Sequence, residues 1–324
     1  MSVLSQPHFH DEAKAFAFLE SVVWAGGVVC PHCGTVEGRV YDLSDVRSKA
    51  SGKNPTGVVR HGLKKCGECR KQFTVKVGTV FEHARLPLHK MLQAVHLIVS
   101  SKKGISSHQL SRVLEVQYKT AWFLAHRIRE AMRSGDLAVP FGIGGGAVEV
   151  DETYFVNRKS KIRGGGGGGH KMAVLALVDR DTRTMRTFAF ECNAAINIHP
   201  IVRANISREA RLMTDEARMY RTIGKEFAEH GTTLHAGKQF VDYEDRTIHT
   251  NTVEGAFSIF KRGMKGVYQH CGEQHLHRYL AEFEFRYNTR IANGVDDRGR
   301  ALEALKGIVG KRLTYARPDP QPEA

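Results

Sequence analysis

Three acidic residues that lie far apart along the chain could together bind divalent metal ions. Asp151 lies in a run that alternates apolar and acidic residues, Asp215 ends a short apolar run, and Glu254 lies on an amphipathic stretch. Carboxylate oxygens suit Mg²⁺, which keeps several waters and takes phosphate oxygens as further ligands. Two such ions about 4 Å apart would activate an attacking oxygen and stabilise a leaving one. These residue types therefore suggest a site that cleaves phosphodiesters without a covalent enzyme intermediate.

Each acid also has a purely structural interpretation. Glu149 and Glu152 flank Asp151, so any of the three could be a solvated strand residue. The two-residue period of a strand puts Glu149 and Asp151 on one face and Glu152 on the other. The choice among them is open on periodicity alone.

The other two acids could belong to helix termini. Asp215 could cap a helix with Glu216 in its first turn. Glu254 follows Asn251 by three positions, which is a capping-box pattern worth about 1 kcal/mol. Asn251, one turn before Glu254, is also a rival for the role of third metal ligand.

The cysteines form a second group with metal-binding chemistry. Two Cys-x-x-Cys pairs, each with Pro or Gly after its first cysteine, suit tight turns that bring two thiolates onto one ion. Four thiolates give the closed tetrahedral site of a structural Zn²⁺, against the alternatives of accidental pairs or a redox pair. The predicted ligands are Cys30, Cys33, Cys66 and Cys69. Cys192 and Cys271 are isolated, and we expect inert or buried thiols there.

The composition indicates a folded protein that binds a polyanion. The 324 residues are 41% hydrophobic and carry a net charge of +14. Such an excess favours nucleic acid as partner, against the alternative of a merely basic enzyme. No apolar run reaches the ~20 residues that cross a bilayer, and the N-terminus lacks a secretory signal pattern. We therefore expect no membrane partner, a cytoplasmic and nucleoid-associated location, and reduced thiols.

Glu254 lies on a predicted helix that begins near His249. An apolar stripe with helical spacing runs through Val253, Phe257, Phe260 and Met264. A polar edge beside it consists of Glu254, Ser258, Lys261 and Lys265. Strands are expected at 147–155, 172–178, 185–191 and 212–216, and helices at 198–207, 220–230 and 274–288. This order predicts an α/β fold, with a mixed sheet between helices, in which the three acids can converge.

Residues 86–134 are predicted to be helical, with Ser106 or Ser107 as the cap of a middle helix whose inward residues are Leu110, Val113 and Leu114. The turn at 115–117 and the basic helix after it, with Lys119 and Arg127, fit a helix-turn-helix. A three-helix packing unit without a DNA role is the alternative.

Two further basic segments could contact DNA phosphates. The cysteine-rich module contains Lys64 and Lys65, which belong either to a phosphate-binding face or to a solvated one. Residues 157–171, with six consecutive glycines, are predicted to form a flexible basic hairpin tip. The glycine run at 141–146 is predicted to be a linker, because a strand follows it rather than the helix of a dinucleotide site.

The chain resembles the bacterial insertion-sequence transposases that join a zinc-ribbon head to a DDE domain of the RNase H-like, integrase type. The resemblance covers roughly residues 15–315. Its main motifs are 150–154 (VDETY), 214–216 (TDE), 249–255 (HTNTVEG) and 261–263 (KRG). It extends to 102–107 (KKGISS), 119–122 (KTAW), 126–129 (HRIR) and 285–288 (FRYN).

The resemblance implies that Asp151, Asp215 and Glu254 are the catalytic triad and bind two Mg²⁺ ions, which Mn²⁺ could replace. Lys261, seven residues after Glu254, matches a basic residue that DDE enzymes often carry, and Arg262 follows it. The implied domains are a zinc-ribbon head (1–85), a helix-turn-helix region (86–140), an RNase H-like catalytic domain (141–315) and a disordered tail (316–324).

The implied function is DNA transposition: binding of double-stranded terminal inverted repeats, strand cleavage, and strand transfer into target DNA. Bringing two element ends together would require a homodimer or a larger assembly. The alternatives are a zinc-ribbon DNA-binding regulator and an RNase H-like nuclease derived from a transposase.

Overall fold

The chain forms two compact units in the computed structural model. The structure describes residues 3–36, 38–44, 46–52, 54–135, 139–156, 171–190, 194–234, 237 and 239–314. The first unit, here the head unit, comprises Met1–Ser101, Ile105–Met132 and Asp297–Ala324. The second, the sheet unit, comprises Lys102–Gly104 and Arg133–Asp296. The predicted boundaries at 85, 140 and 315 stay predictions.

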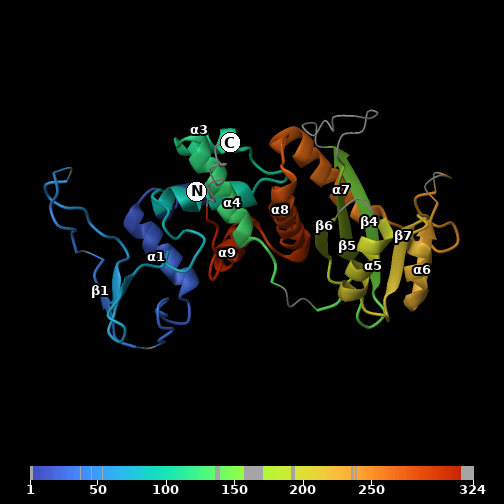
Figure 1. Cartoon of the computed structure of the whole chain (residues 1–324), viewed down its shortest axis with the longest axis horizontal. Helices are drawn as coiled ribbons and strands as arrows, with labels where there is room; N and C mark the ends of the chain where they lie inside the picture. The colour runs from blue at the N-terminus through green and yellow to red at the C-terminus, as the bar shows by residue number, and fades with distance from the viewer. Residues whose placement is uncertain are drawn as a thin grey trace, which may run out of the picture. The chain divides into compact units, whose positions relative to one another are not determined.

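The head unit begins with a capped helix and a small sheet (Figure 1). Asp11 accepts a hydrogen bond from Lys14 N (2.8 Å) and so starts α1 (Glu12–Val23), which buries Phe16 and Leu19. The sheet is antiparallel, in the order β1-β2-β3. Its strands are β1 (Val40–Asp42), β2 (Lys64–Cys66) and β3 (Gln72–Phe73).

The predicted helices after the ribbon are present. They are α2 (Leu88–Val99), α3 (Ser107–Leu114) and α4 (Tyr118–Ala131). Ser106 caps α3 by accepting from Gln109 N (3.1 Å), and Glu115 ends it with a φ of 54°. The prediction that Val113 faces inward is wrong, since its side chain is 53% exposed. A further helix, α9 (Asp297–Lys306), packs on α2, in a region where no helix was predicted from the sequence.

The described residues of the sheet unit contain one mixed five-stranded sheet in the order β6-β5-β4-β7-β8. The strands are β4 (Ala147–Val156), β5 (Lys171–Asp179), β6 (Thr184–Phe190), β7 (Arg211–Asp215) and β8 (Glu229–Thr233). Neighbours are antiparallel from β6 to β4 and parallel from β4 to β8. The predicted helix over 220–230 is wrong in extent, because α6 (Tyr220–Ile223) and a 3-10 turn (Gly224–Glu226) give way to β8.

Helices cover both faces of this sheet, as predicted. On one face, Val174, Ala176 and Val178 of β5 pack against α7 (Asn251–Gly263) and α8 (Leu276–Asn288). On the other, Leu175 and Leu177 pack against α5 (Ala194–Asn205) and α6. The α/β class with a mixed sheet between helices is therefore confirmed.

Some predictions fall on segments that the structure does not describe. The glycine-rich stretch at 157–170, Cys192 and the tail at 316–324 lie outside the described residues. Cys271 is buried at 7% exposure, in agreement with the expectation for that thiol. Among the described helices, none has the length and apolarity needed to cross a bilayer.

Candidate metal centres

The sheet places Asp151 and Asp215 at matching positions on neighbouring parallel strands. The ladder between β4 and β7 pairs Val148 with Leu212 and Glu149 with Met213. Two residues further along each strand are Asp151 and Asp215, which share the sheet face covered by α7. Glu254 lies in the first turn of α7. The three acids thus converge from two strands and one helix.

An open cavity of about 710 Å³ lies over this face of the sheet unit. Asp151 and Glu254 both line it, and α7 supplies most of the other wall. Its remaining lining residues are Phe257, Ser258, Lys261, Arg262, Lys265 and Gly266. The cavity therefore has an acidic end and a basic end, the arrangement expected for a phosphodiester held beside cations.

The acids interact electrostatically across this site. Burial raises the pKa of Asp151 to about 8, with further increases from the charges of Glu152, Asp215 and Glu254. Within the part of the chain that is described, the three carboxylates are not gathered as tightly as the four cysteines below. Crowded carboxylates of this kind fit the donor set of a hard divalent cation, whose charge would offset their repulsion.

This arrangement predicts that the Mg²⁺-free protein loses stability as pH rises. The folded pKa of Asp151, about 8, lies above the unfolded value of about 3.9, so folding favours the protonated acid. The stability that folding gains from the protonated form of Asp151 is fully present below pH ~4 and is lost as pH rises from about 4 to 8. Asp151→Asn should flatten that decline, raising the melting temperature at pH 8 by several degrees, at roughly 2–4 °C per kcal/mol. Thermal unfolding at pH 5 and 8, with zinc retained, measures the difference; equal slopes for both proteins would contradict it.

The neighbouring acid Glu152 contacts the helices on the other face of the sheet, opposite α7. The Tyr220 hydroxyl donates to Glu152 Oε2 (2.6 Å), and Tyr220 belongs to the core cluster under α5 and α6. Burial raises the pKa of Glu152. Its side chain thus points to the sheet face opposite Asp151, as the two-residue period predicts.

The capping box proposed for Asn251 and Glu254 is not the way this helix starts. Asn251 is itself the first residue of α7, and Thr250 precedes it. The Thr250 hydroxyl donates to Glu254 Oε1 (2.9 Å), while Glu149 accepts from the backbone N–H groups of Thr252 and Val253 (both 2.9 Å). Sequence reasoning placed Glu149 on the correct face but did not assign it this role. Its only signal was an acid spaced two residues from Asp151.

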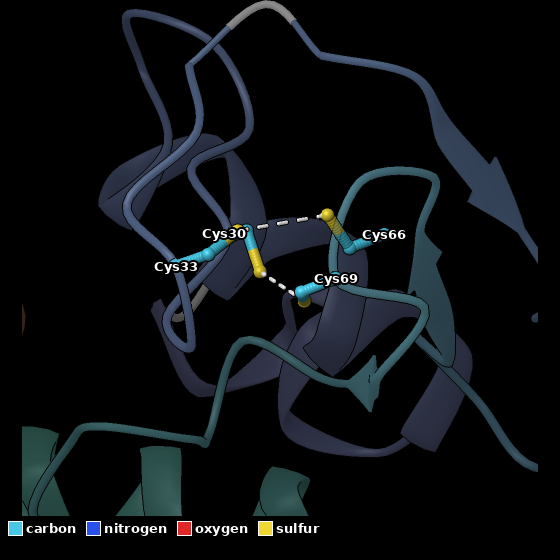
Figure 2. Close-up of side chains that lie close together, drawn as sticks. All are labelled: Cys30, Cys33, Cys66 and Cys69. Atoms are coloured by element: carbon cyan, nitrogen blue, oxygen red, sulfur yellow. Dashed lines mark hydrogen bonds between the residues drawn. The ribbon is translucent and has the colours of Figure 1, made fainter.

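Four cysteine sulfurs gather in the head unit (Figure 2). Cys30 Sγ lies 3.7 Å from Cys69 Sγ, and Cys33 Sγ lies 3.8 Å from Cys66 Sγ. All four lie within 4.8 Å of one another. Tetrahedral Zn²⁺ with Zn–S bonds of about 2.3 Å requires sulfurs about 3.8 Å apart. The predicted cysteines therefore fit one structural zinc ion.

Two turns and a small core position these cysteines. In the first turn Gly34 N donates to Cys30 O (2.9 Å), with Gly34 at a φ of 74° that favours glycine. In the second, Cys66 N donates to Lys71 O (3.0 Å). Hydrogen bonds from Thr35 lower the pKa of Cys33 to about 6, which favours the thiolate that a metal binds.

The two lysines predicted at β2 differ in their surroundings. Lys64 is 6% exposed, and its Nζ lies 3.1 Å from Glu20 Oε2 and 3.3 Å from Asp42 Oδ2. This burial and pairing speak against a contact between Lys64 and a DNA phosphate. The adjacent Lys65 is half-buried and stays a candidate.

The two basic residues predicted on α4 also differ. Arg127 is half-buried; its Nη1 donates to Glu82 O (3.0 Å) and its guanidinium lies 4.7 Å from the Phe123 ring centre. These contacts speak against a free phosphate-binding role. Lys119 is exposed in the first turn of α4, where a recognition helix contacts DNA.

The fold and the sites together define a two-part protein: a head unit with four clustered cysteines that could hold a metal ion, and a sheet unit with three acids on one face of a mixed sheet. Residues 144–288 match the family model described as the ISXO2-like transposase domain, and residues 10–72 match the transposase zinc-ribbon domain. The first match contains all three acids, and the second contains all four cysteines.

A relative spans almost the whole chain. A protein of Halobacterium salinarum, described as an uncharacterized protein in transposable element ISH50, is 24% identical over 94% of this chain and 98% of its own length. Residues 144–288 therefore belong to the ISXO2-like transposase domain family and residues 10–72 to the transposase zinc-ribbon family, which confirms the resemblance to insertion-sequence transposases. The sheet unit has the RNase H-like fold that a DDE domain implies.

Proposed function

We propose that the protein is a DNA transposase that binds the terminal inverted repeats of its element and carries out Mg²⁺-dependent strand cleavage and strand transfer. The observation that supports this most directly is the cavity that Asp151 and Glu254 share with Lys261, Arg262 and Lys265. Acids at one end can hold cations, and bases at the other can hold the phosphate backbone.

The proposed chemistry assigns separate tasks to these residues. Asp151, Asp215 and Glu254 would hold two Mg²⁺ ions, with Mn²⁺ as a substitute. Bound there, the ions would supply the activation of the attacking oxygen and the stabilisation of the leaving oxygen. The lysines would bind the scissile strand's backbone. Arg262 is already oriented, since its Nη2 donates to Ser258 Oγ (2.6 Å) and its Nε to Ser258 O (3.1 Å).

DNA recognition would belong to the head unit. Helices α3 and α4 pack together across the turn at 115–117, which supports the helix-turn-helix hypothesis. Lys119 and Lys65 are the basic residues that we propose for phosphate contacts there. Pairing of two element ends requires at least a dimer, and a protein with these tasks would be found with the nucleoid.

The test is incubation of the purified protein with Mg²⁺ and labelled DNA that carries the inverted repeats flanking its gene. Strand transfer into a target plasmid supports the transposase. Cleavage alone would favour the nuclease, and binding without chemistry would favour the regulator. Omitting Mg²⁺ should stop cleavage without stopping binding, because phosphate contacts by the head unit do not need the acidic centre.

The third acid can be tested against its rival. Asn251 is exposed at the start of α7, whereas Glu254 lines the cavity with Asp151. Asn251→Ala should therefore keep cleavage within about twofold of the native rate, a change of less than about 0.5 kcal/mol in the activation barrier, because Asn251 does not line the cavity. Single-turnover cleavage at saturating Mg²⁺ measures it. A large loss in Asn251→Ala, with Glu254→Gln still active, would reverse the assignment.

A further inference from the structure

Glu149 is a fully buried carboxylate beside the proposed acidic centre. Its side chain is 0% exposed, and it lies on β4 two residues before Asp151, on the same sheet face. A buried carboxylate is costly unless it is paired and hydrogen-bonded. Its partners therefore show what the residue does in the fold.

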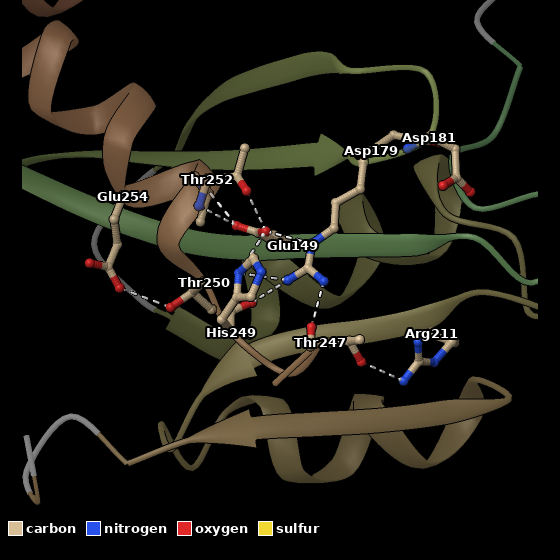
Figure 3. A network of polar contacts seen from close by, with 11 residues as sticks. Glu149, Asp179, Asp181, Arg211, Thr247, His249, Thr250, Thr252 and Glu254 are labelled. Atoms are coloured by element: carbon tan, nitrogen blue, oxygen red, sulfur yellow. Dashed lines mark hydrogen bonds and ion pairs between the residues drawn. The ribbon is translucent and has the colours of Figure 1, made fainter. Parts of the chain in front are cut away.

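The first turn of α7 supplies three of these partners (Figure 3). Glu149 Oε2 accepts from Thr252 N and Val253 N (both 2.9 Å), and Oε1 accepts from the Thr252 hydroxyl (2.7 Å). The first N–H groups of a helix have no partner within the helix, and its N-terminus favours negative charge. Glu149 thus caps α7 from a strand about a hundred residues earlier in the sequence.

Arg180 completes the attachment. Its Nε donates to Glu149 Oε1 (2.7 Å), its Nη1 to Thr247 O (2.5 Å) and its Nη2 to His249 O (2.7 Å). Arg180 N also donates to Ala147 O (3.1 Å) at the start of β4. One guanidinium therefore neutralises the buried acid and fixes the segment that leads into α7.

We infer that Glu149 is a positioning residue for the acidic centre: with Arg180 it fixes the helix that carries Glu254 against the strand that carries Asp151. Thr252 and Val253, which Glu149 holds, immediately precede Glu254, and Asp151 follows Glu149 by two residues. Glu149 thus links the strand of one proposed metal ligand directly to the helix of another. This inference rests on the proposed Mg²⁺-dependent function.

If Glu149 only stabilised the fold, its substitution would lower thermal stability without changing metal affinity. Glu284 provides a comparison for that case. Glu284 is also a buried carboxylate of the sheet unit; it joins α8 to β6 by accepting from Thr187 N (2.9 Å) and from the Thr187 and Ser134 hydroxyls (3.0 and 2.9 Å). Glu284→Gln removes the same kind of charge from a helix that does not carry a proposed metal ligand. It should lower thermal stability and leave metal affinity unchanged.

The experiment measures Mn²⁺ binding by electron paramagnetic resonance on the zinc-loaded full chain, and the Mg²⁺ dependence of DNA cleavage. Glu149→Gln should weaken Mn²⁺ binding by about 10-fold to 100-fold, as losses of residues that orient metal ligands do, and raise the Mg²⁺ needed for half-maximal cleavage. If Glu149→Gln lowers the melting temperature as Glu284→Gln does but leaves Mn²⁺ affinity and Mg²⁺ dependence unchanged, the inference is overturned.

Two further variants make the outcome decisive. Arg180→Lys keeps the positive charge and Glu149 but loses the bonds to Thr247 and His249, so it tests the same attachment should Glu149→Gln not fold. Weakened Mn²⁺ binding in a folded Arg180→Lys protein supports the inference, and native affinity overturns it. Asp151→Asn tests the proposed function itself. If the native protein and this variant bind Mn²⁺ equally, or neither binds it, the acidic centre is not a metal site and the positioning role of Glu149 is refuted with it.

Discussion

Replacing Asp151 with Asn should lower the rate of Mg²⁺-dependent DNA cleavage on the order of 10³-fold, which corresponds to an activation barrier raised by about 4 kcal/mol. The substitution keeps the size of this half-buried side chain but removes the charge that a cation needs. Glu254→Gln should have a comparable effect, because the two residues line the same cavity. Single-turnover cleavage of end-labelled DNA measures both rates.

DNA binding provides the internal control for these variants. Neither substitution changes the head unit, so electrophoretic mobility shifts should show native affinity or a slightly tighter complex, because a negative charge near the phosphates has been removed. Glu209 is a matched acid of the sheet unit: it accepts a hydrogen bond from Gly144 N (2.9 Å) and does not line the cavity. The Glu209→Gln protein should therefore cleave DNA at the native rate. An Asp151→Asn protein that is fully active with Mg²⁺ on the correct DNA would refute the acidic centre.

Local patterns sufficed to predict the elements that position this centre. The stripe of Val253, Phe257 and Phe260 predicts α7 because one helix face must meet the core, and all three side chains are buried there. The cysteine pairs predict the ribbon site because two tight turns need little beyond their own residues. Such features are visible in sequence because the residues that form them are neighbours along the chain.

Features that depend on distant partners could not be predicted in this way. β8 contains Glu229, His230 and Gly231 and has no strand periodicity of its own; pairing with β7 makes it a strand. Lys64 and Arg127 are of the residue types that contact DNA phosphates. In the fold, however, Lys64 forms ion pairs with Glu20 and Asp42, and Arg127 donates to the backbone oxygen of Glu82.

Glu149 illustrates the same limit within the acidic centre. Periodicity placed it beside Asp151, yet its partners lie about a hundred residues away on α7. The order of the elements allowed Asp215 to lie beside Asp151, but only the parallel register of β4 and β7 in the fold brings the two strands together. The residue types of a site can thus be recognised from short stretches of sequence, whereas the contacts that bring those residues together depend on distant parts of the chain.

Cys66→Ser should remove the zinc ion and unfold the ribbon, the second large effect that we expect. Structural zinc sites contribute about 10–16 kcal/mol of apparent binding energy, and a ribbon core built on Cys30, Cys66 and Phe73 is too small to remain folded without it. Atomic absorption should find about one zinc per native chain and almost none in the variant. Limited proteolysis should show new cleavage between α1 and α2.

Cys271→Ser separates the loss of a metal ligand from the loss of any buried thiol. Cys271 lies in the core under α7 and α8, so its substitution should retain zinc. A zinc-free Cys66→Ser protein that stays folded and binds DNA normally would refute the ribbon. The two centres lie in different compact units, so Cys66→Ser should lose DNA binding while Mn²⁺ affinity at the sheet unit stays near native. That result would assign zinc to recognition and Mg²⁺ to chemistry, because loss of one ion would leave the site of the other intact.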